Sequence, residues 1–106
     1  MCNATLYNRL ERADLGVESL LLDTAKESYI QAAHDVSGSD VFEVFANAAH
    51  FYRNTSGRGA PAVMLGPNRA GRFLTVAIAP VEAEGVWRVV TAYWLRESRG
   101  RRRYER

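Results

Sequence analysis

The residues best suited to chemistry gather near the C-terminus of the chain. Trp94 and Tyr104 share that stretch with six arginines: Arg96, Arg99, Arg101, Arg102, Arg103 and Arg106. A guanidinium group can grip phosphate through two parallel N–H donors, and an aromatic ring stacks on an unpaired base, a contact that contributes about 1–3 kcal/mol. This combination predicts binding of single-stranded RNA. The alternative is a solvated terminus whose arginines contact nothing.

The charges of the chain are divided unevenly between its two halves. Residues 1–50 contain three bases and eight acids, which gives a charge of −5. Residues 51–106 contain eleven bases and four acids, which gives +7, so the net charge of the chain is +2. Thirteen of the fourteen bases are arginine, whose planar fork suits phosphate better than the ammonium group of lysine. The C-terminal half is therefore expected to hold a polyanion, although a genome that prefers arginine would leave the same bias.

Two histidines, His34 and His50, are the candidates for a general base, because imidazole side chains titrate close to neutral pH. Each also has a structural interpretation. His34 follows a predicted helix and could cap its carbonyl groups, and His50 precedes a predicted strand. No residue spacing matches a zinc motif, and no glycine-rich phosphate loop follows a strand and opens a helix. We therefore expect no metal and no cofactor.

The length and composition suit one soluble domain that spans residues 1–106. With 106 residues and 47% hydrophobic composition, the chain is long enough for one core and too short for two. Cys2 is the only cysteine, which excludes an internal disulfide and suits a reducing compartment. No apolar stretch approaches the roughly 20 residues of a membrane helix, and the N-terminus does not resemble a signal peptide. These features predict a cytoplasmic protein that does not associate with membranes.

Two segments near the N-terminus have helical spacing. Residues 1–22 carry leucines at loosely helical intervals, which we interpret as a short helix and a connector. Over residues 24–33, an apolar stripe of a second helix is formed by Ala25, Tyr29 and Ala32–Ala33. This second segment is therefore predicted to pack through that stripe.

A further helix is indicated by a capping motif. Ser37 and Asp40 have the spacing at which a hydroxyl and a carboxylate each accept from the other residue's backbone N–H at a helix start. The helix is predicted to begin near Gly38 and to end near Asn47, a residue type that tolerates left-handed geometry. One side of it is expected to be buried, through Val41, Phe42 and Phe45.

The periodicity changes to two in the second half of the chain, as is typical of strands. Strands are predicted at residues 51–54, 62–66, 72–79 and 86–93. Short turns containing glycine or proline separate them, so the four strands should pair as an antiparallel meander. Residues 95–106 could form a short C-terminal helix or tail. The expected fold is α+β, with N-terminal helices packed on this four-stranded sheet.

Alternation assigns the side chains of the fourth strand to two faces. One face is expected to carry Trp87, Val89, Thr91 and Tyr93, and the other Val86, Arg88, Val90, Ala92 and Trp94. Both faces are largely apolar, so helices should cover one of them and a partner or ligand the other. Together with Phe45, Trp87 and Val89 are predicted to belong to the core.

The order of these motifs from about Leu22 onward resembles the BrnT-like branch of the RelE/ParE superfamily of bacterial toxins. The resemblance covers roughly four-fifths of the chain and leaves residues 1–21 as an N-terminal extension. It rests on five segments: Ala33-His34-Asp35-Val36-Ser37 ahead of a helix that ends at Asn47, Leu65-Gly66, Gly71-Arg72-Phe73-Leu74-Thr75-Val76, Val86-Trp87-Arg88-Val89-Val90-Thr91-Ala92, and the closing Arg101-Arg102-Arg103-Tyr104.

This resemblance implies a toxin that cleaves RNA without a metal and is neutralised by a co-expressed antitoxin. Positions that match the family pattern are His34, Arg72, Arg88, Thr91, Arg102 and Tyr104. The implied roles are phosphate contact for Arg72 and Arg88, a possible base for His34, and stacking or proton transfer for Tyr104. RNA and the antitoxin are the implied partners, in a homodimer or a hetero-oligomer with the antitoxin.

Two other functions remain open at this point. Related tails usually carry a glutamate one turn before the final tyrosine, where this chain has Gly100. That difference favours a non-catalytic protein whose arginines bind RNA or an acidic antitoxin. The third possibility is a ParE-like inhibitor of a DNA topoisomerase.

Overall fold

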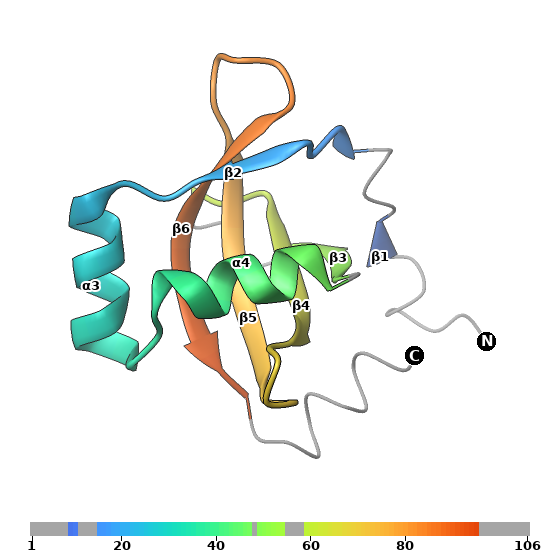
Figure 1. The fold of residues 1–106 in the computed structure, drawn as a ribbon. Helices are drawn as coiled ribbons and strands as arrows, with labels where there is room; N and C mark the ends of the chain where they lie inside the picture. The colour runs from blue at the N-terminus through green and yellow to red at the C-terminus, as the bar shows by residue number, and fades with distance from the viewer. Residues whose placement is uncertain (1–8, 11–14, 48, 55–58, 96–106) are drawn as a thin grey trace.

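The computed structural model describes residues 9–10, 15–47, 49–54 and 59–95. In these ranges the chain forms six strands of one sheet and two helices (Figure 1). The elements are β1 (Arg9–Leu10), β2 (Ser19–Leu21), α3 (Thr24–His34), α4 (Gly38–Ala46), β3 (His50–Arg53), β4 (Ala62–Pro67), β5 (Phe73–Pro80) and β6 (Val86–Trp94). The order of strands across the sheet is β1-β3-β4-β5-β6-β2.

The predicted α+β class and the central meander are confirmed, but the sheet is larger than predicted. Strands β3, β4, β5 and β6 pair antiparallel in chain order. A short helix and a connector were expected over residues 1–22; in the described part of that segment Leu15 is helical, but two strands were missed, because β1 pairs with β3 and β2 pairs parallel with β6. Strand β2 supplies backbone partners to an edge of β6 that would otherwise be open, and it makes the sheet mixed.

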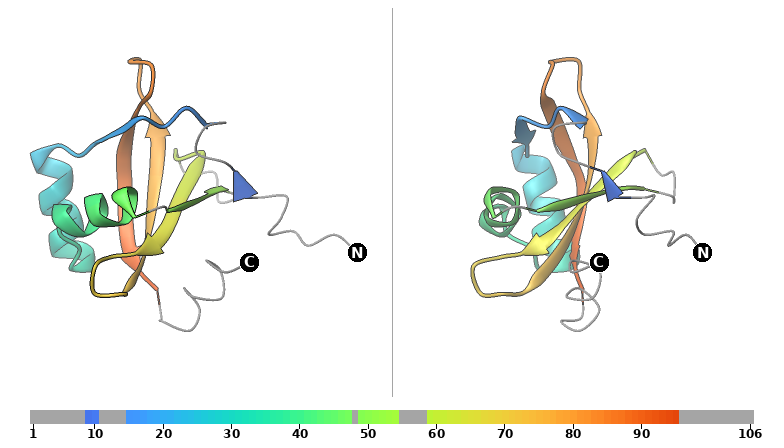
Figure 2. Two further views of the ribbon diagram at one scale, coloured as in Figure 1. Left: turned by 45° about the vertical axis from the view of Figure 1, so that its right-hand side comes forward. Right: turned by 90° about the vertical axis from the view of Figure 1, so that its right-hand side faces the viewer.

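Helix α4 lies across one face of the sheet, against β4 and β5 (Figure 2). The predicted capping box is present: Ser37 Oγ accepts from the Asp40 backbone N–H at 3.1 Å, and Asp40 Oδ2 accepts from the Ser37 backbone N–H at 3.1 Å. The two fully buried apolar side chains of the helix are Val41 and Val44. Their spacing of three residues places both on the side that faces the sheet.

Two expectations for α4 need correction. Phe42 was predicted to be buried but is 43% exposed, because it lies one position beyond Val41 and points away from the sheet. Phe45 is only half-buried, although it does pack against the core. Asn47 caps the C-terminus as predicted, but its φ of −103° is not left-handed.

Helix α3 packs beside β6, at the edge of the sheet where β2 has already ended (Figure 1). It begins after Asp23, whose carboxylate accepts from the Lys26 backbone N–H at 2.7 Å. The predicted stripe was wrong, since its members, Ala25, Tyr29 and Ala32–Ala33, are all exposed. Ile30 is instead the fully buried residue of this helix.

A β-bulge in β6 overturns the predicted assignment of its faces. Val89 pairs with Ile78 and Thr91 pairs with Ala77, so Val90 is an extra residue without an opposite partner. A bulge of this kind shifts the alternation by one position. As a result Trp87 and Val89 share the core face with Ala92 and Trp94, whereas Arg88, Thr91 and Tyr93 lie on the opposite face.

The main core lies between the sheet and α4. It contains Phe51 and Met64 from the early strands and Leu74, Val76 and Ile78 from β5, together with Trp87 and Val89, which confirms the predicted burial of these two residues. A smaller apolar cluster on the opposite face contains Tyr52, Leu65 and Phe73. No helix in the described ranges is long and apolar enough to cross a membrane.

Candidate functional site

Several candidate residues meet at the end of the sheet where β6 finishes. Three elements reach this end: the last turn of α3, the C-terminal part of β6, and the turn at residues 68–72 that joins β4 to β5 (Figure 1). The ring of His34 lies 6.4 Å from that of Tyr93 and 6.1 Å from that of Tyr29, measured between centroids. We call His34, Tyr93, Trp94 and Arg72 the strand-end cluster.

The helical repeat explains why His34 faces β6. Ile30 anchors α3 in the core, and residues four positions apart lie on the same side of a helix. Lys26 and His34 stand four residues before and after Ile30, and both are partly buried. The burial of one isoleucine therefore directs the imidazole toward the end of β6.

Trp94 connects the end of β6 to the end of α3. Its indole N–H donates to the carbonyl oxygen of Asp35 at 3.0 Å, directly after His34 in the chain. Asp35 itself closes α3 in the left-handed conformation, with φ of 55°, and its backbone N–H bonds to carbonyl groups of the last turn. The indole is thereby fixed to the helix terminus that carries the imidazole.

The guanidinium group of Arg72 stacks on the Trp94 ring. Its central carbon lies 4.0 Å from the ring centroid, within the range of a strong cation–π contact. The positive charge of Arg72 is also close enough to Asp40 to lower the pKa of that carboxyl. Stacking uses the face of a guanidinium, so its N–H donors at the edge can still bond to a phosphate.

The turn that carries Arg72 is organised by Asn68. The Asn68 side-chain oxygen accepts from the backbone N–H groups of Ala70 at 3.0 Å and of Arg72 at 2.9 Å. Its backbone N–H donates to the Arg72 carbonyl at 2.9 Å, and its own carbonyl accepts from Gly71 at 3.0 Å. Gly71 adopts a φ of 81°, which residues with a Cβ rarely do. The predicted glycine turn is confirmed.

Helix α4 holds this turn through two carboxylates. Asp40 Oδ1 accepts from the side-chain amide of Asn68 at 3.1 Å, and Glu43 Oε1 accepts from the backbone N–H of Arg69 at 2.9 Å. The two acids stand three residues apart, so they lie on the same side of the helix. The N-terminal half of α4 therefore fixes the position of the turn that carries Arg72.

The environment of Asp40 lowers its pKa below the ordinary value of 3.8. Partial burial by itself would raise the pKa, but hydrogen bonds outweigh it: one from the backbone of Ser37 and others from the Asn68 amide and the Ser37 hydroxyl. The positive charge of Arg72 lowers the pKa further. Asp40 is thus a carboxylate at neutral pH, and its role in this network is to accept hydrogen bonds.

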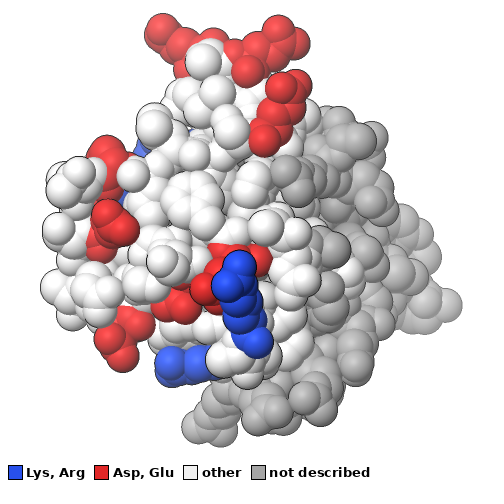
Figure 3. Space-filling model, viewed as in Figure 1, with Lys and Arg blue, Asp and Glu red and all other residues white. Residues whose placement is uncertain are grey.

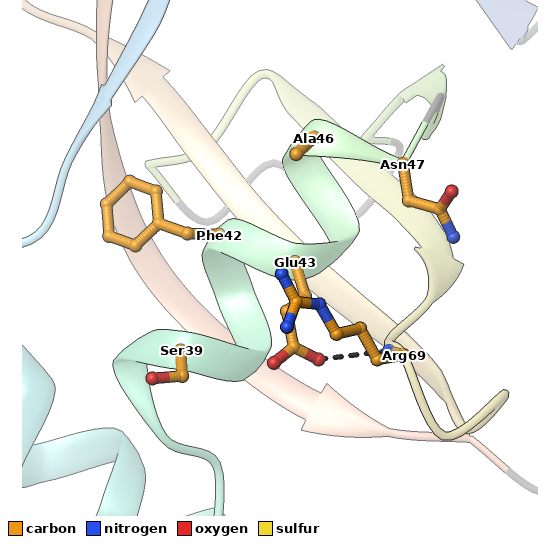
Figure 4. Close-up of a pocket in the computed structure, with 6 residues that line it drawn as sticks. All are labelled: Ser39, Phe42, Glu43, Ala46, Asn47 and Arg69. Carbon is orange, nitrogen blue, oxygen red and sulfur yellow. Dashed lines mark hydrogen bonds between the residues drawn. The ribbon is translucent and has the colours of Figure 1, made fainter.

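A groove of about 570 Å³ lies beside this network, between α4 and the turn (Figure 4). Its lining consists of Ser39, Phe42, Glu43, Ala46, Asn47 and Arg69. Figure 4 shows the Phe42 ring pointing away from Arg69, while the dashed line marks the bond from Arg69 to Glu43. The groove is open to solvent. The bond between two of its lining residues, Arg69 and Glu43, holds the turn on α4.

On the face seen in Figure 3, the described charges do not form one continuous basic surface. On the face that carries α4, acidic side chains lie over the β5–β6 turn and along α3, and the larger basic areas lie lower down (Figure 3). Arg88 is exposed and lies opposite Ala79, near the start of β6. At roughly 3.3 Å per residue, it is about 20 Å along the strand from Trp94. Arg72 and Arg88 therefore do not converge on one phosphate.

The structure places only part of the predicted site. It stacks Arg72 on Trp94 and bonds Trp94 to the end of α3 directly after His34. The His34 ring itself lies beside Tyr93, on the face of β6 that also carries Arg88 and Thr91. Tyr104 and the predicted RNA-binding residues Arg96, Arg99, Arg101, Arg102 and Arg103 lie outside the described residues. The stretch that contains them begins directly after Leu95, at the end of the sheet that carries the strand-end cluster.

Three residues of the site were not predicted. Tyr93 was assigned to the core face, and the β-bulge moves it to the other face, where it is 39% exposed. Asp40 was interpreted only as a cap, and Asn68 only as a turn residue. The sequence does contain a signal for Asn68, since asparagine in a turn often bonds to backbone two residues on, but the contact with Asp40 depends on tertiary structure.

The strand-end cluster can perform general acid–base chemistry beside a bound anion. It offers an imidazole, an exposed phenol and a stacked guanidinium, which are the groups that transfer protons and stabilise negative charge. Among the residues that the structure describes, no group of three His, Cys, Asp or Glu side chains could hold a metal ion.

Comparison with known proteins gives a likeness in fold. No protein-family model matches the chain, and no curated protein sequence matches it. Among solved structures, the fold is similar to the Brucella abortus ribonuclease toxin BrnT, with a TM-score of 0.58 and 18% sequence identity. The similarity covers 74% of this chain and 96% of that one. At this identity the comparison establishes a BrnT-like fold.

Proposed function

We propose that this protein is a toxin that acts as an endoribonuclease through the strand-end cluster. The observation that carries the proposal is the junction at the end of a BrnT-like sheet, where Arg72 stacks on Trp94 and Trp94 bonds to the helix end that carries His34. The ribonuclease toxin named above supports RNA as the substrate. The arginine-rich segment that follows Leu95 in the sequence supports it independently.

The proposed reaction is an internal transesterification of RNA. His34 removes the proton of a ribose 2′-hydroxyl, whose oxygen attacks the adjacent phosphorus as the bond to the 5′-oxygen breaks. Arg72 stabilises the additional negative charge on the phosphate, and a tyrosine or water gives a proton to the departing 5′-oxygen. The products are a 2′,3′-cyclic phosphate and a 5′-hydroxyl. The described phenols beside His34 are Tyr29 and Tyr93, with ring centroids 6.1 Å and 6.4 Å from that of His34, and Tyr104 remains the donor proposed from the sequence.

The substrate proposed is single-stranded RNA. The exposed ring of Tyr93 offers a stacking surface for an unpaired base, which a duplex would not present. The segment with Arg96, Arg99, Arg101, Arg102 and Arg103 would contact the backbone of the strand. Arg88 is proposed to contribute at most to this general attraction, because it lies far from Arg72.

The wider biological setting is also a proposal. Residues 1–106 would form one cytoplasmic domain of the RelE/ParE superfamily, expressed with an antitoxin as a type II toxin–antitoxin pair. The balance of +7 in residues 51–106 supports an antitoxin with an acidic segment. A toxin and antitoxin would then assemble as a hetero-oligomer.

Cleavage of total RNA by the purified protein tests this function. The wild-type protein should degrade RNA in the presence of a chelator, and His34→Ala and Arg72→Ala should each slow cleavage about 100-fold. Arg53→Ala is the matched control, since it removes an exposed arginine from the far end of β3. An intact RNA population after incubation with folded wild-type protein would refute the enzymatic function.

A non-catalytic RNA-binding protein is the second candidate. Gly100 stands where related tails usually carry a glutamate, and this difference favours binding without cleavage. Binding alone predicts salt-sensitive association with a log–log slope of about −2 for three phosphate contacts, and no product. A supercoiling assay would separate both candidates from a ParE-like topoisomerase inhibitor, which would change supercoiling and leave RNA untouched.

A further inference from the structure

We propose that Asn68 is the positioning residue of the site, and that it acts by holding Arg72 over Trp94. Asn68 bonds to both backbone polar groups of Arg72: its side-chain oxygen accepts from the Arg72 N–H, and its backbone N–H donates to the Arg72 carbonyl. The peptide groups on either side of the arginine Cα are thus fixed by one residue. The catalytic relevance of this contact rests on the proposed function, whereas the contact itself does not.

The side-chain amide of Asn68 can serve in only one orientation. Its oxygen faces two backbone donors, those of Ala70 and Arg72, and its nitrogen faces the Asp40 carboxylate at 3.1 Å. A rotated amide would place its NH₂ group against two N–H groups and its oxygen against a carboxylate. Position 68 therefore requires an acceptor on one side and a donor on the other, which asparagine provides.

The Asp40 contact makes the turn rigid relative to α4. The other carboxylate oxygen of Asp40 accepts from the backbone N–H of Ser37 at 3.1 Å and from its hydroxyl at 2.9 Å. A continuous set of hydrogen bonds thus links the N-terminus of α4 through Asp40 and Asn68 to Arg72. Because catalytic efficiency depends on placement to within about 1 Å, loss of this link should reduce catalysis even if the protein stays folded.

A fluorescence measurement tests the positioning without RNA. Iodide is drawn to cations, so a guanidinium stacked on an indole should enhance quenching of Trp94 by iodide relative to neutral acrylamide. Trp94 dominates this signal because Trp87 is only 8% exposed. Arg72→Ala should lower the ratio of the two quenching constants, and Asn68→Ala should lower it toward the same value.

Asn54→Ala is the matched control. Asn54 also donates from its side-chain amide to a backbone carbonyl, that of Ala60 at 2.6 Å, but it lies at the opposite end of the β3–β4 pair. Its substitution should leave the quenching ratio at the wild-type value. A ratio that is unchanged in Asn68→Ala would overturn the proposal whatever the effect on RNA.

Exchange of the two polar partners provides a rescue test. Asn68→Asp places two carboxylates against each other, and Asp40→Asn turns an NH₂ group toward either the Asn68 NH₂ or the Ser37 backbone N–H, so that one of these donors loses its acceptor. The double variant Asp40→Asn/Asn68→Asp restores one donor and one acceptor at the contact and still offers oxygens to Ser37, Ala70 and Arg72. The double variant should recover the quenching ratio that each single variant loses, and failure to recover it would contradict the assigned geometry.

A double-mutant cycle on RNA cleavage separates this proposal from the function itself. Asn68→Ala should slow cleavage about tenfold, and adding it to Arg72→Ala should cause no further loss, because the two residues act as one unit. Additive losses would overturn the positioning role. No cleavage by the wild-type protein, together with the predicted quenching changes, would refute the proposed function and leave the positioning role intact.

Discussion

Replacement of Asp40 by alanine should destabilise the protein by about 2 kcal/mol at neutral pH. The substitution removes the carboxylate that accepts from the backbone N–H and hydroxyl of Ser37 and from the side chain of Asn68. Each such hydrogen bond contributes roughly 0.5–1.5 kcal/mol, and the upper end is discounted because Asp40 is only partly buried. The loss should be measured by urea unfolding monitored through tryptophan fluorescence.

The destabilisation should depend on pH in a defined direction. The pKa of Asp40 is lowered in the folded state, so its contribution to stability is complete above the unfolded value near 3.8 and disappears as the pH falls below it. The difference in free energy of unfolding between wild type and Asp40→Ala should therefore be constant from pH 7 to about pH 5 and should shrink toward pH 2.

Val44→Ala is a suitable control for this measurement. Val44 is fully buried on the same helix and cannot titrate, so the loss of its two methyl groups should cost about 2 kcal/mol at every pH. If the Asp40→Ala difference stayed constant between pH 5 and pH 2 while the Val44→Ala difference did the same, the hydrogen-bonded carboxylate network would be refuted.

Four further substitutions test the packing and the backbone geometry. Phe42→Ser should change the free energy of unfolding by no more than about 0.5 kcal/mol, because the Phe42 ring is 43% exposed. Phe51→Ala should cost about 4 kcal/mol, because the Phe51 ring is only 1% exposed. Equal losses in urea unfolding would show that α4 is rotated. Asp35→Gly should raise the melting temperature by about 4 °C in calorimetry, because glycine adopts the left-handed φ of 55° without strain. A lower melting temperature would show that the hydrogen bond between the Asp35 and Gln31 side chains stabilises the protein by more than the strain destabilises it. Gly66→Val should cost about 2 kcal/mol or more, since a Cβ there already approaches Val44 Cγ1 to 3.3 Å, and unchanged thermal stability would contradict the close packing of α4 on β4.

The regular elements of the second half could be predicted from the sequence because local signals agree with the fold. Alternation and glycine turns predicted four strands whose bounds differ from the structure by at most one residue at each end. The capping box of Ser37 and Asp40 likewise predicted where α4 begins. In each case the signal lies within a few residues of the feature that it specifies, so no tertiary information was needed.

The faces of these elements were harder to predict. Strand β6 is apolar on both sides, so a one-residue shift at Val90 leaves no mark in its pattern. In α3 the small and aromatic residues suggested a buried stripe, but Ile30 alone enters the core, because α3 packs against the edge of the sheet rather than across it. Strands β1 and β2 are too short to show a periodicity of their own.

The candidate site was predicted as residue types but not as an arrangement. His34, Arg72 and Trp94 could be named from the sequence. The contact of Trp94 with the end of α3, where His34 lies, depends on the position of α3 beside β6. Arg88 was grouped with Arg72 because alternation gives no information on distance along a strand. The role of Asn68 depends on Asp40, 28 residues earlier in the chain, and such a contact becomes visible only in the folded structure.

The proposed reaction is tested most directly by cleavage of an RNA oligonucleotide at a mapped site, compared with the same strand carrying a single 2′-deoxy substitution there. The reaction should give a 2′,3′-cyclic phosphate product from the all-ribose strand and no cleavage at the substituted position. The product should be lost with Arg72→Ala but not with Arg53→Ala. Cleavage of the 2′-deoxy strand at the same position, or undiminished cleavage by Arg72→Ala, would contradict it.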